Sequence, residues 1–375
     1  AKKQNPDAVV VAMGCYVQTA AEEVKNDTAV DIVIGNNKKH ELPGLLRKYE
    51  EEKANGETEL AVIDINEKGQ PYEELFLKKT AEHTRAFIKV QDGCNQFCSY
   101  CIIPYARGRV RSRGLADVLN EVKGLAESGF QEVVLTGIHL CSYGIDNGGS
   151  LLELILKTME VPGIRRVRLG SLEPRIITEE FVNALKDQEK FCPHFHLSLQ
   201  SGCDATLKRM NRRYTAEEYY EKCVLLRENF DHPALTTDVI VGFPGETEEE
   251  FAETVAFLKK VAFYETHIFK YSRRKGTKAA VMENQIPEEL KTKRSDILLK
   301  LDKEHRKEYE AVLVGTEQEV LFEEEVTIDR KDWFVGHTKE YVKIAVPAEE
   351  NLANQLQMVK VSAERAGDFL AGEVR

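Results

Sequence analysis

The central part of the chain alternates short apolar runs with longer amphipathic stretches. The apolar runs, which we predict to be strands, lie at 86–90, 132–136, 166–170, 194–199, 235–241 and 265–271. The stretches between them, which we predict to be helices, include 115–128, 151–159, 179–186, 216–228 and 247–260. Strand–helix alternation at this spacing predicts right-handed βαβ units and a parallel sheet, and therefore an α/β fold. Periodicity alone does not distinguish a partial barrel from an open, doubly wound sheet.

Residues 1 to about 80 predict a smaller α/β domain before this central part. An apolar run at 8–12 ends in a glycine followed by Cys15, which is typical of a buried strand that enters a loop. A second short strand is predicted at 32–34 and a helix at 39–53. Because the chain begins directly on a core strand, we expect this domain to be truncated at its N-terminus.

The C-terminal part has the composition of a small β-barrel. Residues 287–310 predict a highly charged helix that connects it to the central part. Short β-type runs separated by glycine, aspartate and proline follow at 319–323, 333–335, 341–346 and 358–361. We therefore expect an N-terminal α/β domain at 1–80, a core at 81–310 and a small antiparallel barrel at 311–375.

Length and composition narrow the class of protein. A chain of 375 residues is too long for one core of ordinary size. No apolar run approaches the roughly 20 residues needed to span a bilayer, and the first residues lack the apolar segment of a signal peptide. Eight cysteines, three of them clustered, fit a reducing compartment better than a secreted disulfide scaffold. We expect a soluble, cytoplasmic protein that does not associate with membranes.

The three clustered cysteines, Cys94, Cys98 and Cys101, follow the first predicted core strand. Their C-x₃-C-x₂-C spacing allows three thiolates to bind three corners of a four-iron cluster, and it leaves the fourth iron free for a small molecule. In a structural metal site every coordination position is filled by the protein. An odd number of ligands in one loop therefore indicates a catalytic site. The alternative is a zinc knuckle completed by His83 or His139, although paired C-x₂-C units are the usual zinc spacing.

Residues 92–113, which read DGCNQFCSYCIIPYARGRVRSR, resemble the cluster motif of the radical S-adenosylmethionine (SAM) superfamily and, within it, the methylthiotransferases. The segments 237–246 and 269–277 are similar to strings of the same family, and the likeness covers most of the chain. Segments 105–113 and 137–144 look most like the branch that methylthiolates N6-threonylcarbamoyladenosine-37 of tRNA.

This resemblance implies a radical SAM partial (β/α)₆ barrel as the core and a TRAM-like, RNA-binding barrel at the C-terminus. It implies SAM and, in the full-length protein, two 4Fe–4S clusters, supplied with electrons by an external donor. Cleavage of SAM would give a 5′-deoxyadenosyl radical that removes the C2 hydrogen of the adenosine. Sulfur would then be delivered at the auxiliary cluster, and a second SAM would supply the methyl group. The expected partner is the anticodon stem-loop of tRNA, and we expect a monomer.

Residues at the ends of the predicted strands and between the cysteines match SAM-contacting positions of this family. The candidates are Phe97, Tyr100, Gly137, Ser171, Glu173, Gln200 and Asp238. Each has a simpler alternative role: a glycine can merely end a strand, Ser171 can be a helix cap, and the two aromatic residues can anchor the loop.

Cys15 matches a different site of the family. Its Met-Gly-Cys-Tyr context is similar to that of the third N-terminal cysteine that binds the auxiliary cluster, and the other two cysteines would precede residue 1. One thiolate cannot hold a cluster, so we expect this chain to hold the SAM-binding cluster and a single ligand of the other. The remaining thiols show no ligand spacing and are expected to be buried or incidental: Cys141, Cys192, Cys203 and Cys223.

Charge is distributed unevenly along the chain. The net charge is −11, yet residues 85–113 contain six basic residues and one acid. A basic patch on an acidic body suits a specific anionic partner. The candidates for tRNA phosphates and for the threonyl carboxylate of the substrate are Arg107, Arg109, Arg111, Arg113, Arg212, Arg273 and Arg274. Residues 311–375 hold thirteen acids and seven bases, which departs from a basic RNA-binding face.

Two other functions stay open. The same chemistry can act on isopentenyladenosine in tRNA or on an aspartate of a ribosomal protein. Alternatively, the chain is a non-catalytic, metal-stabilised RNA-binding protein, which predicts tightly bound zinc and no cleavage of SAM.

Overall fold

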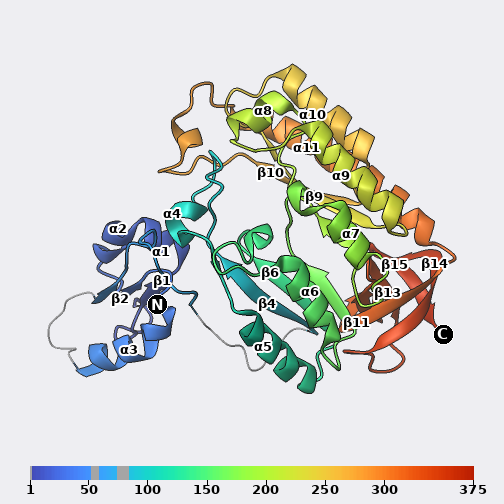
Figure 1. Cartoon of the computed structure of the whole chain (residues 1–375), viewed down its shortest axis with the longest axis horizontal. Helices are drawn as coiled ribbons and strands as arrows, with labels where there is room; N and C mark the ends of the chain where they lie inside the picture. The colour runs from blue at the N-terminus through green and yellow to red at the C-terminus, as the bar shows by residue number, and fades with distance from the viewer. Residues whose placement is uncertain (1, 52–58, 74–83) are drawn as a thin grey trace.

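The computed structural model describes residues 2–51, 59–73 and 84–375. A small N-terminal sheet, a curved central sheet flanked by helices and a C-terminal barrel follow one another along the chain (Figure 1). None of the helices in the described ranges combines the length and the apolar character needed to cross a membrane.

The N-terminal unit is a three-stranded parallel sheet with short helices. Its strands, in the order β1-β2-β3, are β1 (Val11–Met13), β2 (Ile32–Ile34) and β3 (Glu59–Ala61). Its helices are α1 (Cys15–Thr19), α2 (Ala21–Lys25) and α3 (Leu42–Glu51). The helix predicted at 39–53 begins as a 3₁₀ turn at Lys39–Glu41, and its last two residues lie outside the described residues.

The central sheet contains six parallel strands and one short antiparallel strand. In sheet order these are β5 (Arg111–Ser112), β4 (Arg85–Asp92), β6 (Glu132–Gly137), β7 (Arg166–Leu169), β8 (His194–His196), β9 (Ala234–Val241) and β10 (Glu265–Lys270). Single bridges, Val167 with Phe191 and Leu172 with Leu197, join β7 to the segment around β8 and make the surface continuous. The sheet curls into a half-barrel, as the family resemblance implied and the strand–helix pattern alone could not decide.

Helices cover the outer face of this sheet. They are α5 (Leu115–Glu127), α6 (Leu151–Glu160), α7 (Glu179–Leu185), α8 (Asp204–Arg209), α9 (Ala216–Asn229), α10 (Glu248–Val261) and α11 (Glu288–Leu313). The short helix α4 (Ile103–Arg107) instead lies beside α1 of the N-terminal unit. Thr215 and Thr247 begin α9 and α10 with complete capping boxes, which satisfy free backbone N–H groups at both helix starts.

Alternation along each strand separates an apolar outer face from a polar inner face. On β8 and just after it, Phe195 and Leu197 join the core under the helices, whereas His194 and His196 bond Thr236 on the neighbouring strand. The strand predicted at 194–199 is shorter in the structure because pairing after His196 continues only through isolated bridges. The inner face therefore carries the polar groups that a ligand can contact.

The C-terminal part forms a closed five-stranded barrel. Its strands are β11 (Glu317–Ile328), β12 (Lys331–His337), β13 (Lys343–Pro347), β14 (Leu356–Ala366) and β15 (Phe369–Val374), in the order β11-β12-β13-β15-β14. The sequence patterns missed β15. They were also wrong in predicting a wholly antiparallel barrel, because β13 and β15 pair in parallel to close it.

This barrel packs against the end of the half-barrel where the parallel strands begin. Arg166 and Arg168 of β7 are buried, and both pair with Glu132 of β6, at 3.8 and 2.7 Å. Their guanidinium groups also donate to backbone oxygens of the barrel, including His337 O at 2.9 Å and Lys339 O at 2.8 Å. The opposite end of the sheet, where the strands finish, remains available for a site.

Candidate active site

The cysteine loop leaves the carboxyl end of β4 and is held by three other segments. Cys94 N donates to Gly108 O at 3.0 Å, Ser99 N donates to Met210 O at 3.0 Å, and Ala279 N donates to Ser99 O at 2.8 Å. Gly93 has a φ of 73°, and a Cβ there would lie 1.8 Å from a backbone oxygen, so only glycine fits. The loop is therefore fixed before any ligand binds.

Two of the three sulfur atoms in this loop accept a hydrogen bond. Cys94 Sγ accepts from Gln96 N at 3.5 Å, and Cys98 Sγ accepts from Arg212 Nη1 at 3.4 Å. Burial raises the pKa of Cys94 to about 11 and also raises that of Cys101. Donors aimed at sulfur stabilise thiolate charge and are a feature of cluster ligands, so the three residues fit an iron–sulfur cluster.

The zinc alternative depends on a fourth ligand, His83 or His139. Within the described ranges, no group of three or more His, Cys, Asp or Glu side chains is gathered closely enough to hold one metal ion. His139, one proposed zinc ligand, contacts Glu173 through Nε2 at 3.1 Å and Ser142 Oγ through Nδ1 at 2.6 Å. His83, the other, lies outside the described residues.

A buried ion pair faces the cysteine loop. Arg212 Nη2 lies 3.0 Å from Glu173 Oε1, and the two side chains are only 7% and 11% exposed. Burial alone would raise the pKa of Glu173, but His139 and Arg212 hold it below its usual range. The sequence suggested tRNA phosphate or the threonyl carboxylate for Arg212. The structure places it beside Cys98 instead, where it connects the cysteine loop with the end of β7.

Gln91 is a site residue that the sequence patterns missed. Its side chain is fully buried and donates to the backbone oxygens of Asp92 and Gly93 at 2.7 and 2.8 Å, while its amide oxygen accepts from His139 N at 2.7 Å. A Cβ at Gly137 would lie 3.0 Å from Gln91. Gly137 is thus needed for this clamp between β4 and β6. A glutamine that ends an apolar strand was the only signal in the sequence.

The other candidate SAM residues lie in different surroundings. Phe97 is 40% exposed and meets Tyr105 edge to face, whereas Tyr100 packs on Phe243. Ser171 is exposed, and no hydrogen bond of its side chain is seen among the described residues. Gln200, buried with a φ of 72°, donates its backbone N–H to Asp238 O at 2.8 Å.

The carboxylate of Asp238 belongs to a polar group on the inner face. Its Oδ2 lies 3.2 Å from His196 Nε2, and the ring of His267 lies 5.4 Å from that of His196. These side chains come from β8, β9 and β10, so the half-barrel wall on this side presents both donors and acceptors.

Cys15 lies close to the cysteine loop although 78 residues separate it from Cys94. Arg107 Nε donates to Cys15 Sγ at 3.0 Å, and Arg107 ends α4, the helix that begins two residues after Cys101. Asn36 Nδ2 also approaches Cys15 Sγ, at 3.6 Å, and donates to Ala106 O at 2.6 Å. The two cysteine sites of the chain therefore face each other across one short helix.

The basic candidates separate into exposed and buried groups. Arg109, Arg273 and Arg274 are exposed, although Arg273 Nε donates to Ala280 O at 2.5 Å. Arg113 is buried and pairs with Glu121, and Arg111 is buried beside Asp92. Buried guanidinium groups with carboxylate partners are less suited to backbone phosphates than exposed ones.

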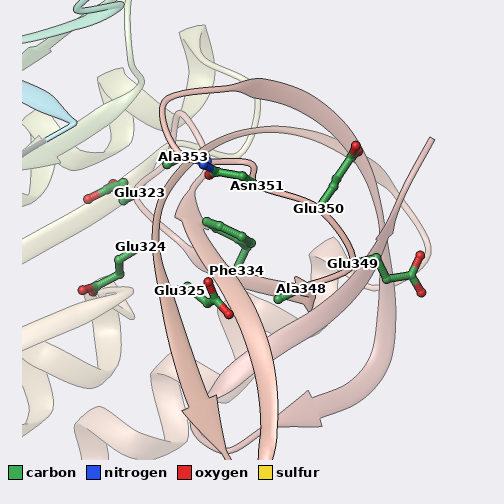
Figure 2. A pocket seen from close by; sticks show the side chains of 9 residues that line it. All are labelled: Glu323, Glu324, Glu325, Phe334, Ala348, Glu349, Glu350, Asn351 and Ala353. Carbon is green, nitrogen blue, oxygen red and sulfur yellow. The ribbon is translucent and has the colours of Figure 1, made fainter.

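The C-terminal barrel carries a cavity of about 450 Å³ on its surface (Figure 2). Its lining includes five glutamates around the ring of Phe334, namely Glu323, Glu324, Glu325, Glu349 and Glu350. Such a lining repels phosphate, so this face of the barrel is not one that RNA would approach through its backbone.

We expect Arg212 to set the reduction potential of a bound cluster. In Arg212→Gln, loss of the charged donor to Cys98 Sγ should make reduction harder and move the midpoint potential down by roughly 60 mV, a tenfold change for one electron. A redox titration followed by electron paramagnetic resonance measures this. Arg209→Gln is the control, because Arg209 pairs with Glu250 instead; equal potentials in both variants and the wild type would contradict the prediction.

Comparison with known proteins gives consistent matches. A family model described as the radical SAM superfamily matches residues 88–258. The chain is 38% identical to a Bacillus subtilis protein named threonylcarbamoyladenosine tRNA methylthiotransferase MtaB, over 96% of this chain and 79% of that protein. It is 37% identical to an Acetivibrio thermocellus protein named tRNA-2-methylthio-N(6)-dimethylallyladenosine synthase, over 100% of this chain and 78% of that protein.

A solved structure matches the fold at low sequence identity. The cobalamin-dependent SAM radical enzyme OxsB superposes with a TM-score of 0.50 and 12% identity, over 80% of this chain and 45% of that chain. At this identity the likeness supports the architecture alone.

Proposed function

Because the chain belongs to the radical SAM tRNA methylthiotransferases, we propose that it replaces the C2 hydrogen of N6-threonylcarbamoyladenosine-37 in tRNA with a methylthio group. The observation that carries this proposal is the arrangement of the two cysteine sites. Cys94, Cys98 and Cys101 lie at the carboxyl end of β4, and Cys15 lies beside the helix that follows them.

The chain's own residues have separable roles in this reaction. The three loop cysteines would hold a 4Fe–4S cluster, and a bound cluster with SAM supplies the radical that removes hydrogen from carbon. Glu173 and Arg212 present a carboxylate and a guanidinium toward the loop, which suits the amino and carboxylate groups of SAM. Cys15 would supply one ligand of the auxiliary cluster.

Sequence identity does not choose between the two tRNA substrates. The relatives with the two different names are 38% and 37% identical to this chain. The threonylcarbamoyl nucleoside carries a carboxylate, whereas the isopentenyl nucleoside is uncharged. Excess positive charge near the two cysteine sites supports the first, because Lys89, Arg107 and Arg111 share a single carboxylate, that of Asp92, and an anionic substituent would balance them further.

The test is nucleoside analysis of tRNA from a strain that lacks this gene. We expect loss of the methylthio form of threonylcarbamoyladenosine, accumulation of the unmethylthiolated nucleoside, and recovery when the wild-type gene is returned. Mass spectrometry of digested tRNA measures both nucleosides. Loss of only the methylthio isopentenyl nucleoside would overturn the substrate assignment, and an unchanged tRNA profile would overturn the proposed activity.

A further inference from the structure

We propose that Lys89, Arg107 and Arg111 form a receptor for the carboxylate of the substrate's N6 threonyl substituent. This rests on the proposed function and deepens it, since it assigns the anionic group of the substrate to a defined cluster. We call these three residues the cation cluster; they surround Asp92 between the two cysteine sites.

All three cations share one carboxylate oxygen. Asp92 Oδ2 lies 2.7 Å from Lys89 Nζ, 3.6 Å from Arg107 Nη1 and 3.6 Å from Arg111 Nη2. The other oxygen, Oδ1, accepts the backbone N–H of Gly93 at 2.8 Å. Asp92 therefore has a full set of partners, whereas the cations around it do not.

The charges in this cluster do not balance. Three cations face one carboxylate. Among the described residues, Lys89 also lies over the ring of Tyr72 at 5.3 Å, Arg107 contacts the sulfur of Cys15, and Arg111 donates to the backbone oxygen of Arg109. Arg111 is only 5% exposed, and its Nε has no hydrogen-bond partner within the described part of the chain.

Among the described residues, two further charged groups of opposite sign, Lys39 and Glu73, act on this cluster, so together they do not change its net charge. Glu73 already accepts a hydrogen bond from His40 N at 3.1 Å. Burial and the neighbouring Arg107 lower the pKa of Lys39, as expected where positive charge is not fully compensated. A buried excess charge is costly unless a ligand of opposite charge binds.

The cluster lies where the reaction must occur. Asp92 is two residues before Cys94, and Arg107 Nε is 3.0 Å from Cys15 Sγ. The Lys89 side chain is 39% exposed, so a ligand can reach it. An anion that binds here is therefore close both to the loop cysteines and to Cys15.

This position favours the N6 substituent over a backbone phosphate. In adenine, C2 and the N6-bearing carbon both flank N1, so a group on N6 extends alongside the atom that reacts. The phosphates are attached through the ribose at N9, on the far side of the purine. An oxyanion receptor next to the reacting edge therefore fits the threonyl carboxylate, which guanidinium and ammonium groups bind strongly.

The test compares two anticodon stem-loop RNAs that differ only in this charge. One carries threonylcarbamoyladenosine, and the other carries its neutral threoninamide. We expect the wild type to bind the acid about tenfold more tightly than the amide, measured by fluorescence anisotropy, because a charged hydrogen-bonding partner is lost. If the wild type binds the two RNAs with equal affinity, that result alone overturns the proposal.

Lys89→Met then assigns the effect to the cluster. It leaves Arg107 and Arg111 beside Asp92, so the carboxylate keeps its counter-ions, and it should reduce the tenfold preference to about twofold. Lys260→Met is the matched control, because Lys260 pairs with a single carboxylate, that of Glu217 at 3.0 Å, on the outer helix α10. It should leave the preference unchanged.

The remaining outcomes are decisive. If Lys89→Met weakens both RNAs equally, the cluster binds a backbone phosphate and the carboxylate assignment is wrong. If the full-length protein methylthiolates threonylcarbamoyl RNA but does not prefer the acid, this inference fails while the proposed function stands. If the full-length protein, with both clusters reconstituted, prefers the acid but produces no methylthio nucleoside under reducing conditions with SAM, the proposed function fails and the receptor stands.

Discussion

Cys98→Ala is expected to abolish SAM cleavage. With one of the three loop thiolates removed, the anaerobically reconstituted protein should lose about four iron and four sulfide per chain. Its formation of 5′-deoxyadenosine in the presence of dithionite should fall by at least about a thousandfold, because the cofactor carries the chemistry. Iron and sulfide assays and chromatography of the reaction products measure these losses.

Cys223→Ala is the matched control for this experiment. Cys223 is a fully buried thiol of α9, in the core beneath the helices, so its removal changes the thiol count equally without touching the loop. The control should keep its iron and its cleavage activity. A colourless wild-type protein that binds zinc, or a Cys98→Ala protein that keeps its cluster and cleaves SAM, would show that the loop is not a cluster site.

Glu132→Ala is expected to lower the free energy of unfolding by about 3–5 kcal/mol, because it leaves two buried guanidinium groups without their carboxylate. Glu132 is fully buried, with Arg168 Nε at 2.7 Å and Arg166 Nη1 at 3.8 Å. Burial alone would raise the pKa of Glu132, but Arg168 keeps it below its usual range, so the carboxylate is charged in the folded protein.

The same change should loosen the C-terminal barrel. Arg168 also lies over the ring of Tyr341, at 4.8 Å, and Tyr341 stacks on His194 across the interface and on His337 within the barrel. Urea unfolding measures the stability, and limited proteolysis of the linker helix α11 reports release of the barrel. Glu160→Ala, which removes a 64%-exposed partner of Lys157, should change stability by less than about 1 kcal/mol. If Glu132→Ala changes the free energy of unfolding as little as Glu160→Ala does, the buried network does not hold the barrel in place.

Local pattern was sufficient to predict much of the fold. The predicted strands at 132–136 and 235–241 differ from β6 and β9 by one residue at one end, because apolar runs flanked by amphipathic helices have few other ways to be buried. The long connector helix was predicted to begin at 287, and Pro287 is its N-cap. The strand β15 was missed because its pairing depends on barrel closure, which connects it to β13 and β14.

The candidate site likewise has a part that the sequence predicted and a part that it did not. The loop cysteines are close in the sequence, so their spacing alone indicated a cluster. Contacts between distant segments had no such signal. Gln91 bonds His139, and Arg212 bonds Cys98 across 114 residues. Arg107, predicted to contact a tRNA phosphate or the threonyl carboxylate, also lies against Cys15, and no pattern in the sequence indicated that contact.

The sequence by itself determined the α/β class, the order of strands and helices, and the three thiols of the cluster loop, because each depends on residues near one another along the chain. Only the tertiary structure decided which cations lie around Asp92, which guanidinium approaches the cysteine sulfurs, and how the C-terminal barrel covers the half-barrel. These features depend on charges and hydrogen bonds between segments that become neighbours only when the sheet curls and its ends are closed.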